Sequence, residues 1–201
     1  SVVDALGLKA LVLFKDARFR SYALVFFFAT LPYQWYYVYA SQYLADSGFK
    51  YLTLTLNLGQ VGEVAFLLII PWMIKRFGYK RCLLIAFGGL VFRNVCFALS
   101  SAGIAAAFDF GGILIHGLVF GLISLGGQFF ANDNAPEALR SQAQGLITML
   151  LIGIGTFASN YLFDVILNMT AICGENRWTR VGWGLTLVVF AVIALISSPF
   201  G

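Results

Sequence analysis

Long apolar segments, separated by short polar stretches, occupy most of the chain. An α-helix needs about 20 apolar residues to cross the hydrocarbon core of a bilayer, and these segments reach that length. The pattern predicts six membrane-spanning helices, at residues 21–44, 52–74, 81–100, 104–131, 138–169 and 181–198. The fourth and fifth predicted spans are longer than a bilayer requires, so we expect them to tilt or to extend beyond it.

The first 20 residues differ from the rest of the chain. A short apolar patch at 6–14 precedes a charged run, KDARFR, at 15–20. This pattern predicts a cytoplasmic or interfacial segment, residues 1–20, that leads into a helical membrane domain, residues 21–201.

The composition agrees with a membrane protein and excludes other classes. Hydrophobic residues make up 60% of the chain and charged residues 11%, and the mean hydropathy is +0.86. A soluble domain carries nearer a quarter of charged residues. The formal net charge of +4 does not indicate nucleic-acid binding, because the basic residues lie in loops between apolar segments.

The residue types that enzymes and metal sites use are scarce. The chain has one histidine and three cysteines without metal-ligand spacing, and it has no Ser-His-Asp set, catalytic carboxylate pair or HExxH run. We therefore expect no enzymatic activity, no cofactor and no metal site.

The cations divide unequally between the two sides that alternating spans define. One side holds nine Lys and Arg residues and the other holds three. Cytoplasmic loops of membrane proteins carry the excess of these residues, so we expect both termini to face the cytoplasm. The nine are Lys9, Lys15, Arg18, Arg20, Lys75, Arg76, Lys80, Arg81 and Arg140; the three are Lys50, Arg177 and Arg180.

The second predicted span carries three polar residues on one broad helical face. Asn57, Gln60 and Glu63 follow one another at intervals of three. A carboxylate inside a membrane span is costly unless it lines a polar cavity or has a partner, and it indicates a functional site. The alternative is structural, since polar side chains also join neighbouring helices, worth about 1 kcal/mol. Arg93 in the third span could pair with Glu63, reach the interface or bond to carbonyls.

The first and fourth predicted spans add further candidates. Gln34 lies among tyrosines and a tryptophan just after Pro32, which indicates either an interfacial aromatic belt or a stacking wall for a flat ligand. His116 is followed one turn later by Phe120, and glycines around them indicate close helix packing. A lone membrane histidine is either a satisfied polar core group or a proton carrier that titrates near neutrality.

Two loops carry a family resemblance. KRFGYKR at 75–81 resembles the basic, glycine-containing loop between the second and third helices of each half of major facilitator transporters, and EALRSQAQG at 137–145 resembles the loop that opens the fifth helix. Within that superfamily the chain is most similar to the second half of the nucleoside:proton symporter family. The features in the same order are Leu13-Phe14-Lys15, Gln60-x-x-Glu63, Ile70-Pro71, Arg93 and Ala143-Gln144-Gly145.

The resemblance implies an all-α membrane fold, in which six transmembrane helices form the C-terminal half of a major-facilitator-type bundle. It also implies substrate-binding residues, with Glu63 and His116 as the candidates for proton coupling. His116 stands where the family has a tyrosine, and Gly121 stands where the family has an acid after the aromatic residue. The substrate-binding residues that the resemblance implies are Gln34, Gln60, Glu63, His116 and Phe120.

The function expected from the resemblance is proton-coupled uptake of nucleosides, or of a similar small polar and aromatic solute, by alternating access. Its partners would be substrate, protons, lipid and an N-terminal six-helix half, missing here, or a partner subunit. The location would be the bacterial inner membrane. The alternative is a non-transporting structural or assembly subunit of a larger complex that retains the transporter fold.

Overall fold

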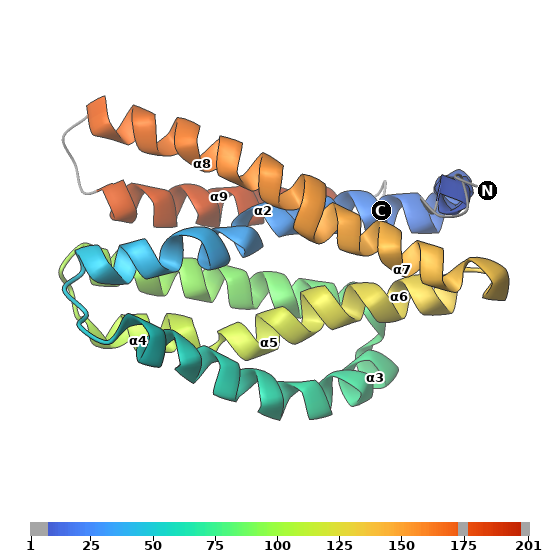
Figure 1. Ribbon diagram of the computed structural model, residues 1–201, viewed down its shortest axis with the longest axis horizontal. Coiled ribbons are helices and arrows are strands. Elements are labelled where there is room, and N and C mark those ends of the chain that lie inside the picture. The colour runs from blue at the N-terminus through green and yellow to red at the C-terminus, as the bar shows by residue number, and fades with distance from the viewer. Residues whose placement is uncertain (1–7, 173–176, 198–201) are drawn as a thin grey trace.

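The structure, a computed structural model, describes residues 8–172 and 177–197, and every regular element in these ranges is helical. The longer helices run side by side along one axis (Figure 1). In chain order the elements are η1 (Leu8–Lys15), α2 (Ala17–Asp46), α3 (Leu52–Ser101), α4 (Ala107–Leu114), α5 (His116–Phe120), η2 (Gly121–Leu125), α6 (Gly126–Asn134), η3 (Glu137–Leu139), α7 (Arg140–Thr148), η4 (Met149–Ile154), α8 (Gly155–Ile172) and α9 (Arg177–Ser197).

The element α3 contains two of the predicted spans. At Gly78 the backbone leaves the helical region, with φ 74° and ψ 166°, and the chain reverses direction there. Only glycine adopts these angles without strain. The two arms of α3, before and after Gly78, therefore lie antiparallel, as the second and third predicted spans require.

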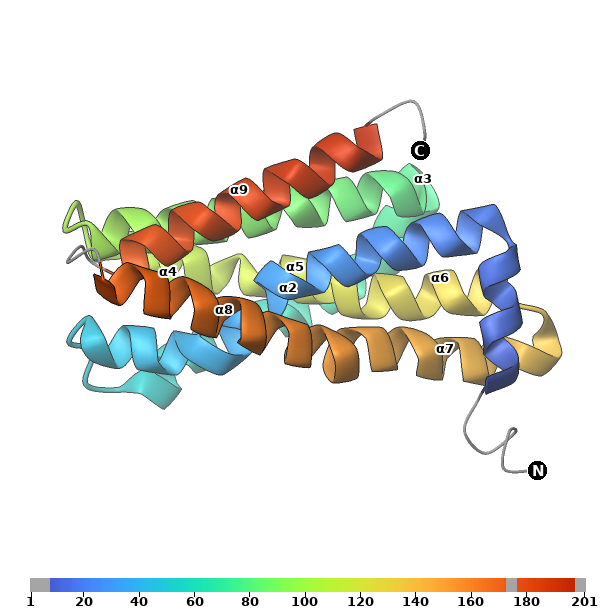
Figure 2. The same cartoon turned by 90° about the horizontal axis from the view of Figure 1, so that it is seen from above.

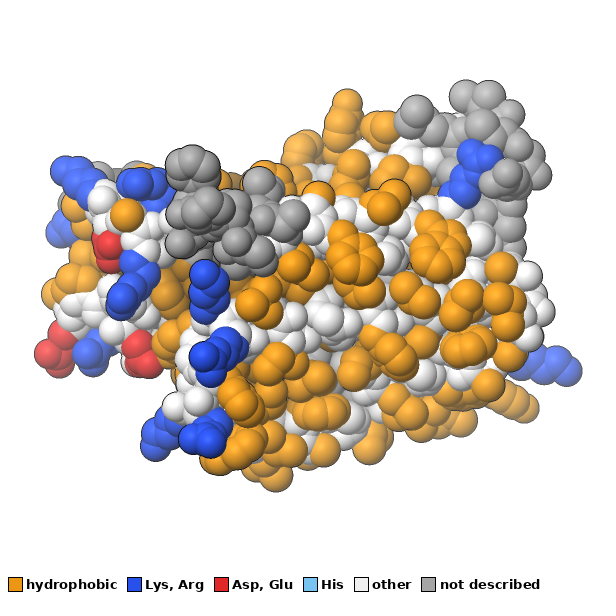
Figure 3. Space-filling model, turned by 180° about the vertical axis from the view of Figure 1, so that it is seen from behind, with side chains coloured by type: hydrophobic (Ala, Val, Ile, Leu, Met, Phe, Trp, Pro, Cys, Tyr) orange, Lys and Arg blue, Asp and Glu red, His pale blue; other side chains and the backbone are white. Residues whose placement is uncertain are grey.

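Three helices of the described residues are long and apolar enough to cross a membrane, at Leu52–Ser101, Ala107–Asn134 and Glu137–Asn168. Because the first of them turns back at Gly78, the three cover four of the six predicted spans. The first and last predicted spans correspond to α2 and α9, which pack against α3 and α8. Figure 3 shows an apolar surface over most of the bundle, with Lys and Arg gathered mainly at one end.

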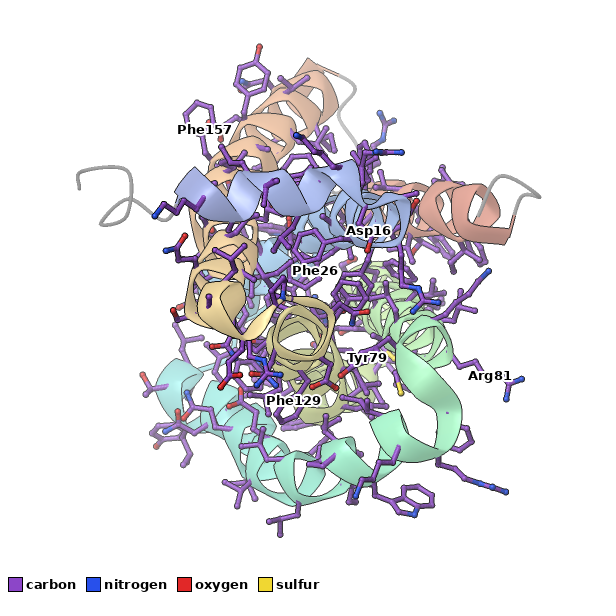
Figure 4. The ribbon with its side chains drawn as sticks, turned by 90° about the vertical axis from the view of Figure 1, so that its right-hand side faces the viewer. Asp16, Phe26, Tyr79, Arg81, Phe129 and Phe157 are labelled. Carbon is purple, nitrogen blue, oxygen red and sulfur yellow. The ribbon has the colours of Figure 1, made fainter. Side chains whose placement is uncertain are left out.

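The buried core consists of two apolar clusters, one toward each end of the bundle. The first, which we call the inner cluster, includes Phe19, Phe26, Phe87, Phe130 and Ile147. The second, the outer cluster, includes Trp35, Tyr43, Phe97, Phe163 and Trp178. Figure 4, seen from the end with the α6–α7 connection, shows Phe26 pointing into the interior, whereas Arg81 and Phe157 point outward.

The helix α2 passes through both clusters and bends between them near Pro32. Proline lacks an N–H and prevents regular backbone bonding one turn earlier. Side chains from other helices bond to the carbonyls here: the Ser159 hydroxyl donates to the Leu31 oxygen at 2.9 Å, and Arg93 Nη2 donates to the Pro32 oxygen at 3.0 Å. The two parts of α2 differ in direction (Figure 2), and these bonds hold the bend.

Candidate functional site

A carboxylate and an imidazole meet in the middle of the bundle, between the two apolar clusters. Glu63 Oε1 on the first arm of α3 lies 2.8 Å from His116 Nε2 on α5. The His116 side chain is 2% exposed and the Glu63 side chain 20% exposed. The pair therefore joins a buried ring to a carboxylate that is partly exposed at the surface of this chain.

Two glycines bring this pair together. Gly62 on α3 and Gly117 on α5 sit where the two helices cross, and a Cβ atom on Gly117 would lie 2.6 Å from the Gly62 carbonyl oxygen. That separation is below what real Cβ atoms show, so the crossing requires glycine. The neighbouring residues, Glu63 and His116, come into hydrogen-bonding distance because the backbones approach so closely.

Arg93 lies on the other side of the imidazole and is fully buried. Its Nη1 atom lies 3.5 Å from His116 Nδ1, and its Nη2 atom donates to the carbonyl oxygens of Pro32 and Tyr33 at 3.0 and 3.4 Å. Of the three interpretations that the sequence left open for Arg93, the contacts of its guanidinium match carbonyl bonding. Its connection to Glu63 runs through His116.

Two tyrosines of α2 complete the surroundings of the histidine. The Tyr36 ring stacks on the His116 ring, with centroids 4.2 Å apart, and Arg93 lies 5.0 Å from the centroid of the same tyrosine ring. The Tyr37 hydroxyl lies 3.2 Å from His116 Nε2. Both belong to the aromatic run around Gln34 that the sequence indicated as either an interfacial belt or a stacking wall, and neither was among the predicted substrate-binding residues. Their position one turn after Pro32 was the available signal, since side chains four residues apart share a helical face.

The remaining predicted site residues have different surroundings. Phe120 is half-buried, and its ring centroid lies 6.2 Å from that of His116. Gln34 is buried and donates from Nε2 to the Leu151 carbonyl oxygen at 2.6 Å, whereas Gln60 is exposed on α3. The structure thus brings Glu63, His116 and Phe120 together, places Gln34 in a bond between α2 and η4, and leaves Gln60 at the surface.

Two π-helical turns border the site. The segment η2 follows directly after Phe120, and η4 contains the carbonyl that accepts from Gln34. Such turns insert one extra residue into a helix and occur often at functional sites. Gly121, at the family's acid position, opens η2, and a Cβ atom there would lie 2.7 Å from Ile70 Cγ1. Gly121 therefore packs directly against Ile70 of α3, and there is no room for a side chain at this position.

A second polar cluster lies nearer the end of the bundle with the α2–α3 connection. The Tyr43 hydroxyl and the Ser100 hydroxyl donate to the two oxygens of buried Asp109, at 2.5 and 2.7 Å. A hollow of about 640 Å³ borders this cluster. Within residues 8–172 and 177–197, no group of three or more His, Cys, Asp and Glu residues is arranged to hold a metal ion.

Known proteins similar to this chain are transporters. A family model described as "Nucleoside H+ symporter" matches residues 1–199. The protein "Putative nucleoside transporter YegT" of Escherichia coli (strain K12) is 32% identical over 203 residues, which cover 97% of this chain and 48% of that protein. The xanthosine permease of the same organism is 27% identical over 211 residues, which cover 98% of this chain and 49% of the permease.

A solved structure shows the same fold. The crystal structure of a variant of the nucleoside transporter NupG superposes with a TM-score of 0.82 at 20% sequence identity, and the match covers 98% of this chain and 53% of that one. The chain spans about half the length of the curated relatives it matches.

Proposed function

The chain belongs to the nucleoside H+ symporter family, and we propose that it forms one six-helix half of a secondary transporter for nucleosides or a similar small polar and aromatic solute. Uptake would be driven by the inward movement of protons. The observation that carries this proposal is the partly exposed Glu63 carboxylate at the middle of the bundle, bonded to His116. An ionisable pair at that depth is costly, and such groups in membrane proteins mark substrate and proton pathways.

The residues near this pair suit a nucleoside. A carboxylate accepts hydrogen bonds from ribose hydroxyls, an amide pairs with the edge of a base, and an aromatic ring stacks on its face. We assign these roles to Glu63, Gln60 and Phe120 in turn. Gln34 would join them when its bond to the Leu151 carbonyl opens.

The exposed polar residues of α3 support a second six-helix half that packs against this helix. Asn57 and Gln60 are exposed on the first arm of α3, between apolar residues that are also exposed. Polar side chains on a membrane-facing surface need polar surroundings, which a second six-helix half would supply. That half would be an N-terminal part of the same protein or a partner subunit, and substrate would bind between the halves.

We place the protein in the bacterial inner membrane with both termini in the cytoplasm. The support is the gathering of Lys and Arg at the end of the bundle that contains η1, the Gly78 turn and the α6–α7 connection. We expect a membrane-impermeant thiol reagent to label Arg81→Cys in inverted vesicles but not in intact cells. Labelling of Arg81→Cys in intact cells would show that the proposed orientation is wrong.

Transport can be tested with the full-length protein in proteoliposomes. We expect an inward proton gradient to accelerate uptake of labelled nucleoside. Glu63→Gln should abolish that acceleration while exchange of internal for external nucleoside persists. Glu137→Gln makes the same chemical change at an exposed position of η3 and should leave acceleration unchanged. If the wild-type protein binds and moves no nucleoside under any gradient, the proposal is wrong and an assembly role takes its place.

A further inference from the structure

His116 is held between an anion and a cation that come from the two arms of α3. The Glu63 carboxylate faces Nε2 at 2.8 Å, and the Arg93 guanidinium faces Nδ1 at 3.5 Å. The other polar groups that face the ring are on α2: the Tyr37 hydroxyl lies 3.2 Å from Nε2, and the Tyr36 ring covers one face. One anion and one cation therefore decide where the protons of this ring reside.

Arg93 determines which ring nitrogen is unprotonated. A guanidinium has five N–H donors and no acceptor, and it does not lose its proton in proteins. Its Nη1–H can point at Nδ1 only if that nitrogen presents a lone pair, because two donors cannot share a hydrogen bond. The ring proton then resides on Nε2, which lies 2.8 Å from Glu63 Oε1.

The position of Arg93 is itself fixed, so the ring cannot easily displace it. Its Nη2 atom is bonded to the carbonyl oxygens of Pro32 and Tyr33 on α2. The Arg93 side chain is fully buried, and it packs over the Tyr36 ring. A second proton on His116 would place two cations side by side in a low-dielectric interior.

We propose that Arg93 is a positioning residue that keeps His116 neutral with its proton on Nε2, so that Glu63 alone takes up and releases the transported proton. The mobile proton adds to a carboxylate oxygen of Glu63 and leaves from it, and no other bond changes. His116 donates to Glu63 in both states. That the proton on Glu63 is the transported one rests on the proposed function. The protonation state of the His116 ring does not depend on it.

The ring can be observed directly by nitrogen-15 NMR of histidine-labelled full-length protein in bilayers. The His116 signals are assigned by their disappearance in His116→Gln. We expect Nδ1 unprotonated and Nε2 protonated throughout the range from about pH 5 to pH 8, in which an ordinary histidine titrates. The proposal is wrong if the wild-type ring gains a second proton within this range or carries its proton on Nδ1. The wild-type measurement decides this without any variant.

Two variants test the role of Arg93. Arg93→Met removes the charge at similar side-chain length, and we expect His116 to titrate within the same pH range. Tyr36→Phe is the matched control, because the Tyr36 hydroxyl is buried without a hydrogen-bond partner and its ring remains on His116; we expect no change in protonation. If Arg93→Met folds and His116 still does not titrate, Arg93 is not the cause and the proposal is wrong.

Transport adds an independent measurement. With Arg93→Met, the pH dependence of gradient-driven uptake should shift relative to wild type and to Tyr36→Phe, because His116 then competes for the proton. An unchanged pH profile in a transporting Arg93→Met variant contradicts the role of Arg93 in keeping His116 from competing for the proton. A wild-type protein that moves no nucleoside but shows the expected ring protonation would overturn the proposed function and leave the assignment of His116 intact.

Discussion

Replacing Gly117 with alanine should separate the two helices that hold Glu63 and His116. The added Cβ would lie 2.6 Å from the Gly62 carbonyl oxygen, and ordinary contact begins at 3.4 Å. The Gly62 carbonyl carbon and the Glu63 backbone nitrogen would lie closer still, so the helices must part by more than about 0.8 Å if the strain is relieved by separation alone. The Glu63–His116 distance of 2.8 Å would then exceed about 3.6 Å, which is too long for a hydrogen bond.

This substitution has consequences for both stability and coupling. Overpacking a well-filled interior costs about 1–3 kcal/mol, so we expect a lower midpoint of thermal unfolding for the full-length protein in detergent. Gradient-driven uptake of labelled nucleoside should fall much more than exchange, because the variant loses the bond at the carboxylate while the other proposed binding residues keep their positions.

Gly88→Ala provides the matched control. It lies on the second arm of α3, and an added Cβ there meets nothing within 4 Å. In the interior of a helix this change should be neutral or stabilising by about 0.5–1 kcal/mol, because alanine loses less backbone entropy. If Gly117→Ala unfolds at the same temperature as Gly88→Ala and retains full gradient-driven uptake, the argument from the helix crossing is refuted.

Three further substitutions test other parts of the structure. Gly78→Ala should destabilise the protein by about 1–3 kcal/mol, seen as a lower unfolding midpoint, because φ 74° and ψ 166° strain any residue with a Cβ; an unchanged midpoint would argue against the turn. Tyr43→Phe removes a donor to buried Asp109 and should cost about 1–3 kcal/mol in denaturant unfolding, with no loss expected only if the carboxyl finds another donor. Gly121→Asp restores the family's acid but meets Ile70, so we expect lower stability and no stronger gradient response; a stronger response would contradict the packing argument.

The helices could be predicted from sequence because a bilayer permits few backbone conformations. Every backbone polar group inside a bilayer must be bonded within the protein, so a long apolar run forms a helix. The predicted all-α membrane fold, as one half of a major-facilitator-type bundle, is confirmed. Boundaries were less accurate: α2 begins at Ala17, four residues before the predicted start, because the Asp16 side chain caps it by accepting from the Arg18 N–H.

The candidate site could be predicted as chemistry but not as geometry. Glu63 and His116 were selected because each is costly in a membrane, yet their contact depends on the crossing at Gly62 and Gly117. Glycines in a sequence indicate close packing without saying which helices meet. The role of Arg93 was open for the same reason, since its contacts come from helices far away in sequence.

The π-helical turns explain why Gln34 was difficult to interpret from sequence. Regular spacing predicts which residues share a face only while a helix keeps 3.6 residues per turn. The turn η4 breaks that rule, and the carbonyl of Leu151 within it accepts from Gln34. Residue types alone do not reveal such a turn, so the position of Gln34 as a ligand for substrate stays a prediction.

The division of the core into two apolar clusters has a mechanical consequence. No buried residue belongs to both the inner and the outer cluster, and α2 changes from one to the other between Tyr33 and Trp35. Each end of the bundle is therefore held together by its own packing. A movement of one end relative to the other would strain the polar bonds around Pro32 before it disturbed the packing within either cluster.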